Sequence, residues 1–372
     1  MIRLQGHPHI VHVITTVMLG GAEKQLTILV REQIKNGLSV TVIFLKGEGE
    51  LVDILNRSGA KVVSEIANQN PVIQLIKLAR FLQFNGKQIS IIHAHLPRAQ
   101  ILSALAIRRS QKLICSRHDE DQFFPNGRKF ISKFLFKVVD KKTTKWVAIS
   151  DSVKKTLEIH GEIIASSRVE VAHYGITPIS ELEVPSGTVV PLRVNESLVI
   201  GCVARLVHQK DHKTLLRGFA QFSTKYADAK LMIVGDGPLM GTLQRMAREI
   251  KISEKVIWCG RVTDVNTYFQ QMDIFVLAST TEGFGLVLLE AMQNGVAVIG
   301  ANNSAIPEVI GNAGLLFEPG NPSDLALKLE DLSNPEMRHR LSNAGVQRLA
   351  FFTPEIMEKR IRRIYMEAGV KL

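Results

Sequence analysis

Cysteine is scarce in this chain of 372 residues, and long apolar runs are missing. The three cysteines, Cys115, Cys202 and Cys259, are odd in number, far apart and each embedded in an apolar run. This argues against a disulfide framework and a cysteine metal site, and it predicts reduced thiols in a cytoplasmic protein. No stretch reaches the roughly 18 apolar residues of a membrane span, and the segment 10–19 has no signal-peptide cleavage pattern.

The positive charge of the chain is concentrated in its first half. The formal net charge is +11, of which residues 1–190 carry +9 and the remainder +2. Such a field attracts phosphates, nucleic acid or an anionic membrane surface. The aromatic platform or recognition motif of a nucleic-acid-binding protein is missing. We therefore expect no nucleic-acid partner, and that function is the remote alternative.

Strand-like and helix-like runs alternate almost throughout, which predicts parallel sheets covered by helices. Residues 177–196, with three prolines and few apolar side chains, separate two such series. The sequence therefore predicts an α/β protein of two Rossmann-like domains, residues 1–190 and 191–353, with the final helix of 354–372 packing back on the first. Ligands of such open sheets bind beyond the carboxyl ends of the strands, so the loops there are the candidate sites.

The stretch 281–290 carries the clearest signal for a ligand site. An apolar run leads into a glycine-rich turn, and the next run keeps helical spacing as far as Asn294-Gly295. The first amides of a helix lack partners and carry partial positive charge, so a phosphate can dock on the amides of Gly285 to Val287. Glu282 and Glu290 can then reach the ligand from either side.

Two other loops suit phosphate. Gly20-Gly21 lets the backbone approach a ligand at a helix N-terminus, although no third glycine or acidic ribose partner supports a dinucleotide site. Arg205 and Lys210 lie at the two ends of one loop. They can neutralise a diphosphate leaving group, or they are solvated surface charges.

Histidines also follow predicted strands. His118 can donate a hydrogen bond to a sugar hydroxyl, or it is structural. His93 and His95 are similar candidates, and the sequence shows no third ligand that would complete a zinc site with them.

The segment 128–145 predicts an amphipathic basic helix, because lysines alternate there with phenylalanine and aliphatic residues. Such a helix can lie on an anionic membrane surface. The alternative is a core helix with a lysine-rich outer face.

Taken in order, these loops resemble the retaining nucleotide-sugar glycosyltransferases of family four, which have the GT-B fold. The main match is the E-x(7)-E motif, which runs from Glu282-Gly283-Phe284-Gly285 to Glu290. Shorter matches support it over nearly the whole chain: Gly20-Gly21, Ala204-Arg205-Leu206 with Lys210, Gly235-Asp236-Gly237-Pro238-Leu239, Gly260-Arg261-Val262 and Ser150. The resemblance implies two Rossmann-like domains with parallel sheets that face each other across a cleft.

The resemblance also implies roles for the matching residues. Glu290 would hold the ribose of the donor nucleotide, while Glu282 and His118 would meet the donor sugar. Arg205 and Lys210 would clamp the diphosphate. The other implied donor-binding positions are Arg261 near the base, the backbone at Phe284, Gly285, Leu286 and Val287, and Gly20 with Gly21 from the first domain.

The chain departs from the family pattern at three places. Tyr174-Gly175-Ile176-Thr177 stands where Asn-Gly-Ile-Asp is common. Asn303-Ser304-Ala305 replaces a common Gly-Gly, and Asp211 replaces the glycine after the loop lysine. None of these changes removes a charge that the chemistry needs.

The expected activity is that of a retaining glycosyltransferase without metal or cofactor, since Arg205, Lys210 and the helix amides can neutralise the departing diphosphate. We expect a nucleotide-sugar donor and a glycan or lipid-linked acceptor used for surface polysaccharide. The enzyme would be cytoplasmic and peripheral on the inner face of the membrane. A nucleotide-sugar epimerase or a phosphorylase of the same fold is the nearer alternative.

Overall fold

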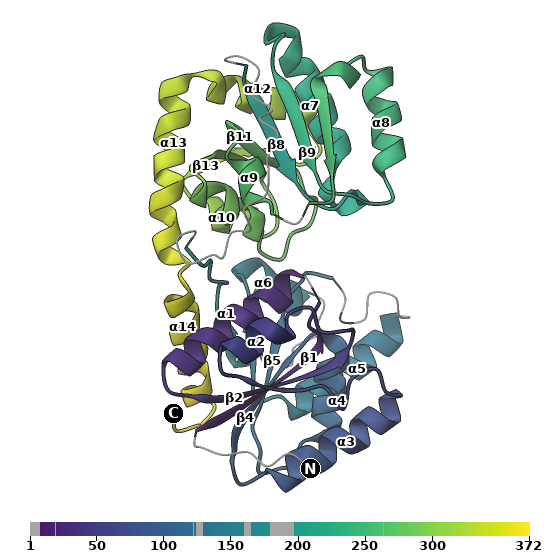
Figure 1. Ribbon diagram of the computed structural model, residues 1–372, viewed down its shortest axis with the longest axis vertical. Helices are drawn as coiled ribbons and strands as arrows, with labels where there is room; N and C mark the ends of the chain where they lie inside the picture. Colours follow the sequence, from purple (N-terminus) through teal and green to yellow (C-terminus); the bar gives the residue numbers. More distant parts are fainter. Residues whose placement is uncertain are drawn as a thin grey trace. The chain divides into compact units, whose positions relative to one another are not determined.

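The computed structural model describes residues 8–18, 20–121, 123, 129–159, 165–178, 197–262 and 264–372. The chain divides into two compact units, residues 1–175 with 352–372 and residues 176–351 (Figure 1). The division thus falls after Gly175 rather than after residue 190. The chain already joins the second unit there, because the Gln293 side-chain amide donates to the carbonyl of Thr177 at 2.7 Å. Most of the expected linker, 179–196, lies outside the described residues.

The first unit contains a parallel sheet of seven strands in the order β3-β2-β1-β4-β5-β6-β7. Helices α1 and α2 cover one face of this sheet, and α3, α4 and α5 cover the other (Figure 1). Its elements are β1 (His9–Thr16), α1 (Gly21–Lys35), β2 (Ser39–Lys46), α2 (Val52–Arg57), β3 (Lys61–Val63), α3 (Pro71–Phe84), β4 (Ile89–His95), α4 (Pro97–Ala106), β5 (Leu113–Arg117), α5 (Lys129–Lys142), β6 (Lys145–Ala148), α6 (Asp151–Ile159), β7 (Val169–Val171) and α14 (Pro354–Glu367).

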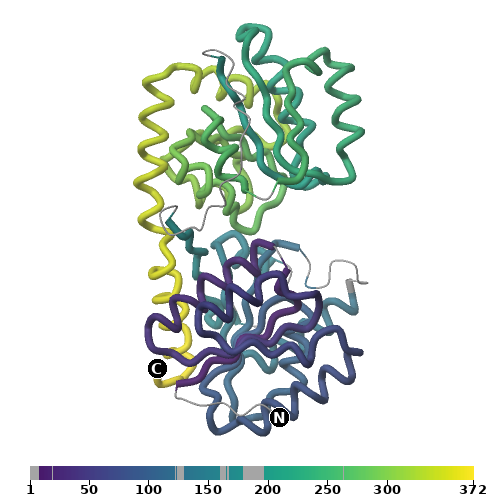
Figure 2. The backbone as a smooth tube through the Cα atoms, viewed as in Figure 1, coloured from purple at the N-terminus to yellow at the C-terminus, as the bar shows by residue number. Residues whose placement is uncertain are grey.

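Helix α14 lies beside α1 in the first unit, although the two helices are at opposite ends of the sequence (Figure 2). Thr353 caps α14 by accepting from the amide of Ile356, and a proline occupies its first position. The Asn36 side-chain amide donates to Glu358 Oε2 at 3.2 Å, which joins the end of α1 to α14.

The second unit contains a parallel sheet of six strands in the order β10-β9-β8-β11-β12-β13. Its elements are β8 (Val199–Val203), the 3₁₀ turn η3 (His208–Lys210), α7 (His212–Lys225), β9 (Lys230–Val234), α8 (Met240–Glu249), β10 (Val256–Gly260), α9 (Asn266–Phe269), β11 (Ile274–Leu277), α10 (Leu286–Gln293), β12 (Ala297–Ala301), α11 (Ile306–Ile310), β13 (Gly314–Phe317), α12 (Pro322–Ser333) and α13 (Pro335–Arg348). Among the described residues, no helix combines the length and apolar character needed to cross a membrane.

The alternation of strands and helices that the sequence predicts is present in both sheets. Strand β3 is short and ends at Val63, because the chain turns there and the amide of Ala67 bonds to the carbonyl of Ser64. In each sheet the strand order reverses at the middle, between β1 and β4 and between β8 and β11. The loops that follow these neighbouring strands therefore meet at one edge of each sheet, where open α/β sheets bind ligands.

Candidate functional site

In the second unit, the loop after β8 is hydrogen-bonded to the loop after β11. The amide of Thr280 donates to the carbonyl of Gln209 at 2.8 Å, and the Gln209 side chain donates to the carbonyl of Thr281 at 2.9 Å. Lys210 Nζ then lies 2.5 Å from Glu282 Oε2, and the two side chains are only 20% and 17% exposed. The strand order thus joins two predicted site residues that are 72 positions apart.

Helix α10 begins directly after this ion pair. Gly285 caps the helix with φ +90° and ψ 47°, a left-handed conformation that glycine adopts without strain. Buried Phe284 anchors the loop, and Leu286 and Val287 supply the first amides of the helix, which have no carbonyl partner within it. Glu290 follows one turn later and is half-buried. Glu282 thus precedes these amides along the chain and Glu290 follows them, and the prediction that both contact a bound ligand stays a prediction.

The Gly235–Leu239 motif supports the loop after β8 through backbone contacts. The amide of Leu206 donates to the carbonyl of Asp236 at 3.0 Å, and the amide of Leu239 donates back to Leu206 at 3.1 Å. A Cβ atom on Gly237 would lie 2.6 Å from the Leu206 carbonyl oxygen, and one on Gly235 would overlap the carbonyl of Ala204. Both glycines are therefore needed for this close packing.

Two departures from the family pattern retain a glycine-like backbone. Asp211 has φ +40° and Ser304 has φ +50°, so both occupy the left-handed region. Short polar side chains tolerate that region because they can bond locally. The Asp211 carboxylate does so by accepting from the amide and hydroxyl of Thr214 at 3.3 and 2.6 Å, which caps α7. These changes therefore preserve the loop shapes.

The two predicted arginines are exposed on the surface of the second unit. Arg205 lies on the same loop as Lys210 and follows β8, at the middle of the sheet. Arg261 follows the edge strand β10, two strands away from β8 and thus about 10 Å along the sheet. Arg205 therefore shares a loop with Lys210, next to the Lys210–Glu282 pair, whereas Arg261 lies at the edge of the sheet, farther from that pair.

Gly20 and Gly21 lie at the start of α1 in the first unit. Gly20 is the N-cap and its carbonyl accepts from the amide of Lys24 at 2.9 Å, while exposed Gly21 begins the helix. The carboxylate of Glu23 turns back toward Gly20, and its burial raises the pKa of Glu23. Leu19, between the strand and these glycines, is outside the described residues.

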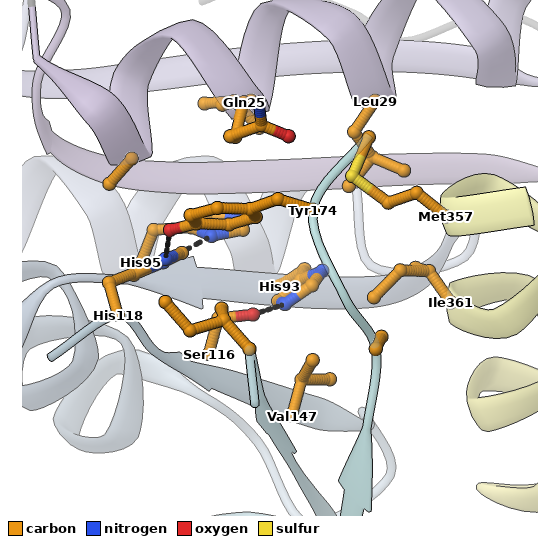
Figure 3. Close-up of a pocket in the computed structure, with 14 residues that line it drawn as sticks. Gln25, Leu29, His93, His95, Ser116, His118, Val147, Tyr174, Met357 and Ile361 are labelled. Carbon is orange, nitrogen blue, oxygen red and sulfur yellow. Dashed lines mark hydrogen bonds between the residues drawn. The ribbon is translucent and has the colours of Figure 1, made fainter. Parts of the chain in front are cut away.

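His118 directly follows β5 and is half-buried (Figure 3). Its Nδ1 lies 2.6 Å from the Tyr174 hydroxyl and its Nε2 lies 3.2 Å from His95 Nδ1. Burial lowers the pKa of His118 to about 3, with a smaller contribution from the neighbouring Arg117. The ring is therefore neutral at physiological pH and uses both nitrogens within the first unit.

The histidine pair predicted on β4 has a third member that the sequence reading missed. His93 and His95 point to the same face of β4 because they are two residues apart, and His12 pairs with His93 in register on β1. Burial lowers the pKa of His12 to about 4 and the pKa values of the other two well below 6.5. The missing signal was the parallel pairing of β1 with β4, since the 72 residues 17–88 lie between these two strands in the sequence.

The three rings could supply nitrogen ligands to a metal ion, since one nitrogen from each lies within 4.8 Å of the others. However, their centroids lie only 4.2 to 5.2 Å apart at interplanar angles of 30 to 38°, with the rings of His12 and His95 stacked and the other two pairs tilted. His12 Nδ1 also bonds directly to His95 Nε2 at 3.0 Å. An ion would have to replace this bond, so the arrangement suits a hydrogen-bonded network better than a metal centre.

Helix α5 carries the predicted basic segment, of which residue 128 lies outside the described residues. Its inner face is buried through Ser132, Phe136 and Val139. Its outer face exposes three large apolar side chains, Phe130 (82%), Phe134 (60%) and Ile131 (48%), beside exposed lysines at 133 and 137. The outer face is therefore both apolar and basic. A core helix with only a lysine-rich outer face, the alternative left open by the sequence, would not expose these apolar side chains.

Two family models match this chain. The model for glycosyltransferase family 4 matches residues 19–178, and the model for glycosyl transferases group 1 matches residues 190–348. Together the two matches include the loops described above in both units. The chain belongs to the family four glycosyltransferases.

Individual relatives agree with this membership. The N-acetyl-alpha-D-glucosaminyl L-malate synthase of Bacillus anthracis is 38% identical to this glycosyltransferase over 128 residues, which are 34% of the chain and 33% of that protein. The matched segments span between a third and a half of the first three curated relatives' own lengths. The capsular polysaccharide biosynthesis glycosyltransferase CapM of Staphylococcus aureus is 23% identical over 315 residues, 81% of the chain and 82% of that protein.

The fold also has solved counterparts. The crystal structure of HepE from Anabaena in complex with UDP superimposes with a TM-score of 0.78 at 18% identity, covering 96% of this glycosyltransferase and all of HepE. The two parallel sheets with their flanking helices are those of the GT-B fold, which confirms the predicted fold class.

Proposed function

We propose that this glycosyltransferase transfers a sugar from a nucleoside-diphosphate sugar to a glycan or lipid-linked acceptor. The configuration of the sugar would be retained, and no metal ion would be needed. The observation that carries the proposal is the pairing of Lys210 with Glu282 at the start of α10. In a nucleotide sugar the β-phosphate is bonded to the sugar, so an anion and a set of hydroxyl donors lie side by side. A cation and a carboxylate at 2.5 Å match that pair of groups.

Lys210 and Glu282 would exchange partners when the donor binds. The ammonium group of Lys210 would turn to the β-phosphate, while the carboxylate of Glu282 would accept from sugar hydroxyls. Arg205, on the same loop, and the amides of Leu286 and Val287 would add positive charge around the diphosphate. Because negative charge on the leaving phosphate grows along the reaction, these groups would lower the barrier by more than they strengthen ground-state binding.

Retention would follow if the acceptor attacks from the face that the phosphate leaves. The bond from the anomeric carbon to the phosphate oxygen breaks, and the diphosphate departs with the electron pair. The acceptor oxygen bonds to the anomeric carbon and gives its proton to a phosphate oxygen. Glu282, which would accept from the sugar hydroxyls once the donor has drawn Lys210 to the phosphate, would have a binding role in this scheme and not that of a nucleophile.

The acceptor would be presented at an anionic membrane surface that α5 contacts. Phe130, Ile131 and Phe134 would enter the lipid interface, while Lys133 and Lys137 would lie near the anionic head groups. A peripheral position of this kind suits a cytoplasmic enzyme that extends a lipid-linked glycan. The name of CapM, a capsular polysaccharide glycosyltransferase, supports an acceptor of this class.

Thermal shift against a panel of nucleoside diphosphates and nucleotide sugars tests the donor, since a ligand that binds only the folded state stabilises it by mass action. We expect the ligands of one base to raise the melting temperature of the protein, both the nucleoside diphosphate and the nucleotide sugar that carry this base. Release of free diphosphate only when an acceptor is present separates a transferase from an epimerase or a phosphorylase. No shift across the whole panel would refute the donor site.

Flotation with anionic and neutral vesicles tests the membrane contact. The double substitution F130S/F134S should reduce binding to anionic vesicles, whereas V72S/I76S on α3 should not, although that helix also exposes apolar side chains. Equal absence of binding to both kinds of vesicle by the unmodified protein would remove the membrane from the proposal.

A further inference from the structure

A chain of five hydrogen-bonded side chains runs through the first unit, from α1 to the segment after β7. Gln33 Oε1 lies 2.8 Å from His12 Nε2, and His12 Nδ1 lies 3.0 Å from His95 Nε2. His95 Nδ1 then lies 3.2 Å from His118 Nε2, and His118 Nδ1 lies 2.6 Å from the Tyr174 hydroxyl. Each ring nitrogen of the three histidines therefore has one partner within the chain.

The position of one proton in this chain determines all the others. A buried neutral imidazole has one N–H donor and one bare nitrogen acceptor. The Gln33 oxygen can only accept, so the proton of His12 is on Nε2 and its Nδ1 must accept from His95. The same rule puts the protons of His95 and His118 on Nε2. His118 Nδ1 is thereby an acceptor, and the Tyr174 hydroxyl is the donor that meets it.

A second arm of the network begins at the same Gln33 amide and is consistent with the same orientation. The Gln33 Nε2 group donates to the Tyr365 hydroxyl at 3.4 Å. Tyr365 can then donate to His93 Nδ1 at 2.6 Å, and His93 Nε2 can donate to the Ser116 hydroxyl at 2.7 Å. If the Gln33 amide were turned over, both arms would have to reverse together. One side chain on α1 therefore determines the tautomers of four histidines.

We propose that Gln33 is a positioning residue that acts through His12 and His95 to present Nδ1 of His118 as an acceptor, and that a hydroxyl of the donor sugar replaces Tyr174 on that nitrogen. The proposal rests on the proposed function and on the contact with the donor sugar that the family resemblance implies for His118. An acceptor nitrogen selects a hydroxyl donor, which every sugar ring carries. Tyr174 is one of the departures from the family pattern, so its place on His118 is a feature of this chain.

The surroundings of Tyr174 give its ring limited space to move. A cavity is lined by His95, Ser116, His118 and Tyr174 together with Gln25 (Figure 3). The Tyr174 hydroxyl already lies on His118 Nδ1 at 2.6 Å, so a sugar hydroxyl has to displace it to reach that nitrogen. The charged groups that act on this end of the chain are Arg117 at His118, and Asp119 and Glu23 at Tyr174.

Nitrogen NMR of histidine-labelled protein tests the first half of the proposal directly. Two-bond and three-bond proton couplings distinguish a protonated Nε2 from a protonated Nδ1, and single substitutions assign the rings. We expect His12, His95 and His118 of the unmodified protein to be neutral Nε2–H tautomers at pH 7. A neutral Nδ1–H tautomer at His118, or an even mixture, would overturn it.

Two variants test whether this tautomer matters for the donor. Q33L should scramble the tautomer of His118 and raise the KM for the donor about three- to tenfold, which is the range for one net hydrogen bond. Q74L is the matched control, because Gln74 is also a buried helical glutamine but donates to the backbone carbonyls of Leu45 and Ile66 at 2.6 and 3.0 Å, away from the histidines. Equal KM values in Q33L and Q74L would reduce Gln33 to a structural role.

Y174F tests the exchange with the sugar hydroxyl, using UDP-glucose, UDP-N-acetylglucosamine and GDP-mannose as probes. Removing the competing hydroxyl should lower the Kd of the preferred probe by about three- to tenfold. Weaker binding in Y174F would overturn the exchange. If the unmodified protein has the expected tautomers yet binds none of the three probes, the tautomer assignment holds, but the exchange and the choice of donor class are refuted.

Discussion

The histidine network of the first unit and the paired loops of the second unit both form where strand order reverses, yet their electrostatics are opposite. In the first unit, His12, His95 and His118 are neutral and hydrogen-bonded in sequence, and neutral His93 bonds to Tyr365 and Ser116 beside them. In the second, a lysine and a glutamate remain about one-fifth exposed, with an exposed arginine on the same loop. The same sheet topology thus supports a neutral hydrogen-bonded network in one unit and a charged pair of loops in the other.

The difference follows from access to water. Full burial disfavours charge, so titratable groups remain inside the first unit only as neutral hydrogen-bonding groups. Partial exposure lets Lys210 and Glu282 stay ionised while their loops hold them in place. A charged ligand is therefore expected to act mainly on the second unit, and a ligand hydroxyl mainly on the first.

The largest expected effect comes from removing the cation of the charged site. K210A should lower kcat/KM for donor-dependent transfer by about 10²- to 10³-fold, which is the usual cost of losing one group that stabilises a developing anion. Circular dichroism should show an intact fold. K213A, an exposed lysine on α7, is the control and should retain activity. Turnover of K210A equal to that of the unmodified enzyme would contradict the site assignment.

A smaller effect is expected from disturbing the backbone support of the charged site. G237A places a methyl group 2.6 Å from the Leu206 carbonyl oxygen and should lower the free energy of unfolding by about 1 to 3 kcal/mol. G241A, on α8 with no atom within 4 Å of the added carbon, should raise it by about 0.5 to 1 kcal/mol. Urea unfolding measures both, and the same sign for the two variants would disprove this reading of the loop contact.

The neutral network should respond to pH. The native pKa values of His12 and His118 are about 4 and about 3, both below the unfolded value near 6.5. The unfolded state therefore binds more protons between pH 6.5 and about 4, and stability falls as the pH falls through that window. Within this window, each such histidine lowers the free energy of unfolding by about 1.4 kcal/mol for every unit by which the pH falls. Buried Glu23, whose pKa is raised, acts in the opposite sense.

The measurement is the pH dependence of urea unfolding between pH 6 and 4.5. H12N should reduce the slope of the unfolding free energy against pH, relative to the unmodified protein, by about 1.4 kcal/mol per pH unit, which corresponds to one bound proton. An unchanged slope would mean that His12 is already charged in the folded state, which the network does not allow.

Much of the fold could be predicted from local sequence. Apolar strands, helical spacing and stop signals such as Asn294-Gly295 depend on nearby residues, so the alternation of the two series was readable along the chain. The boundary between the units was not, because it depends on contacts of residues 176–178 with the second unit. The GT-B fold followed once the ordered loop motifs were recognised.

The candidate site divides in the same way. The sequence identified Lys210 and Glu282 separately, since each lies in a loop after a strand, but only the pairing of β8 with β11 makes them ion-pair partners. His12 gave no signal of its own, since a histidine within an apolar strand is usually a structural residue. Its partners Gln33 and His95 come from two other elements, α1 and β4.

The sequence by itself determined the type and order of the elements, the glycine-rich turn that leads into a helix at 281–290 and the uneven charge. These depend on spacing and residue type within a few turns of chain. Only the tertiary structure decided which loops meet, which histidines are neutral and where the protons of the network lie. Those properties depend on parallel strand register and burial, which join residues that are far apart in the sequence.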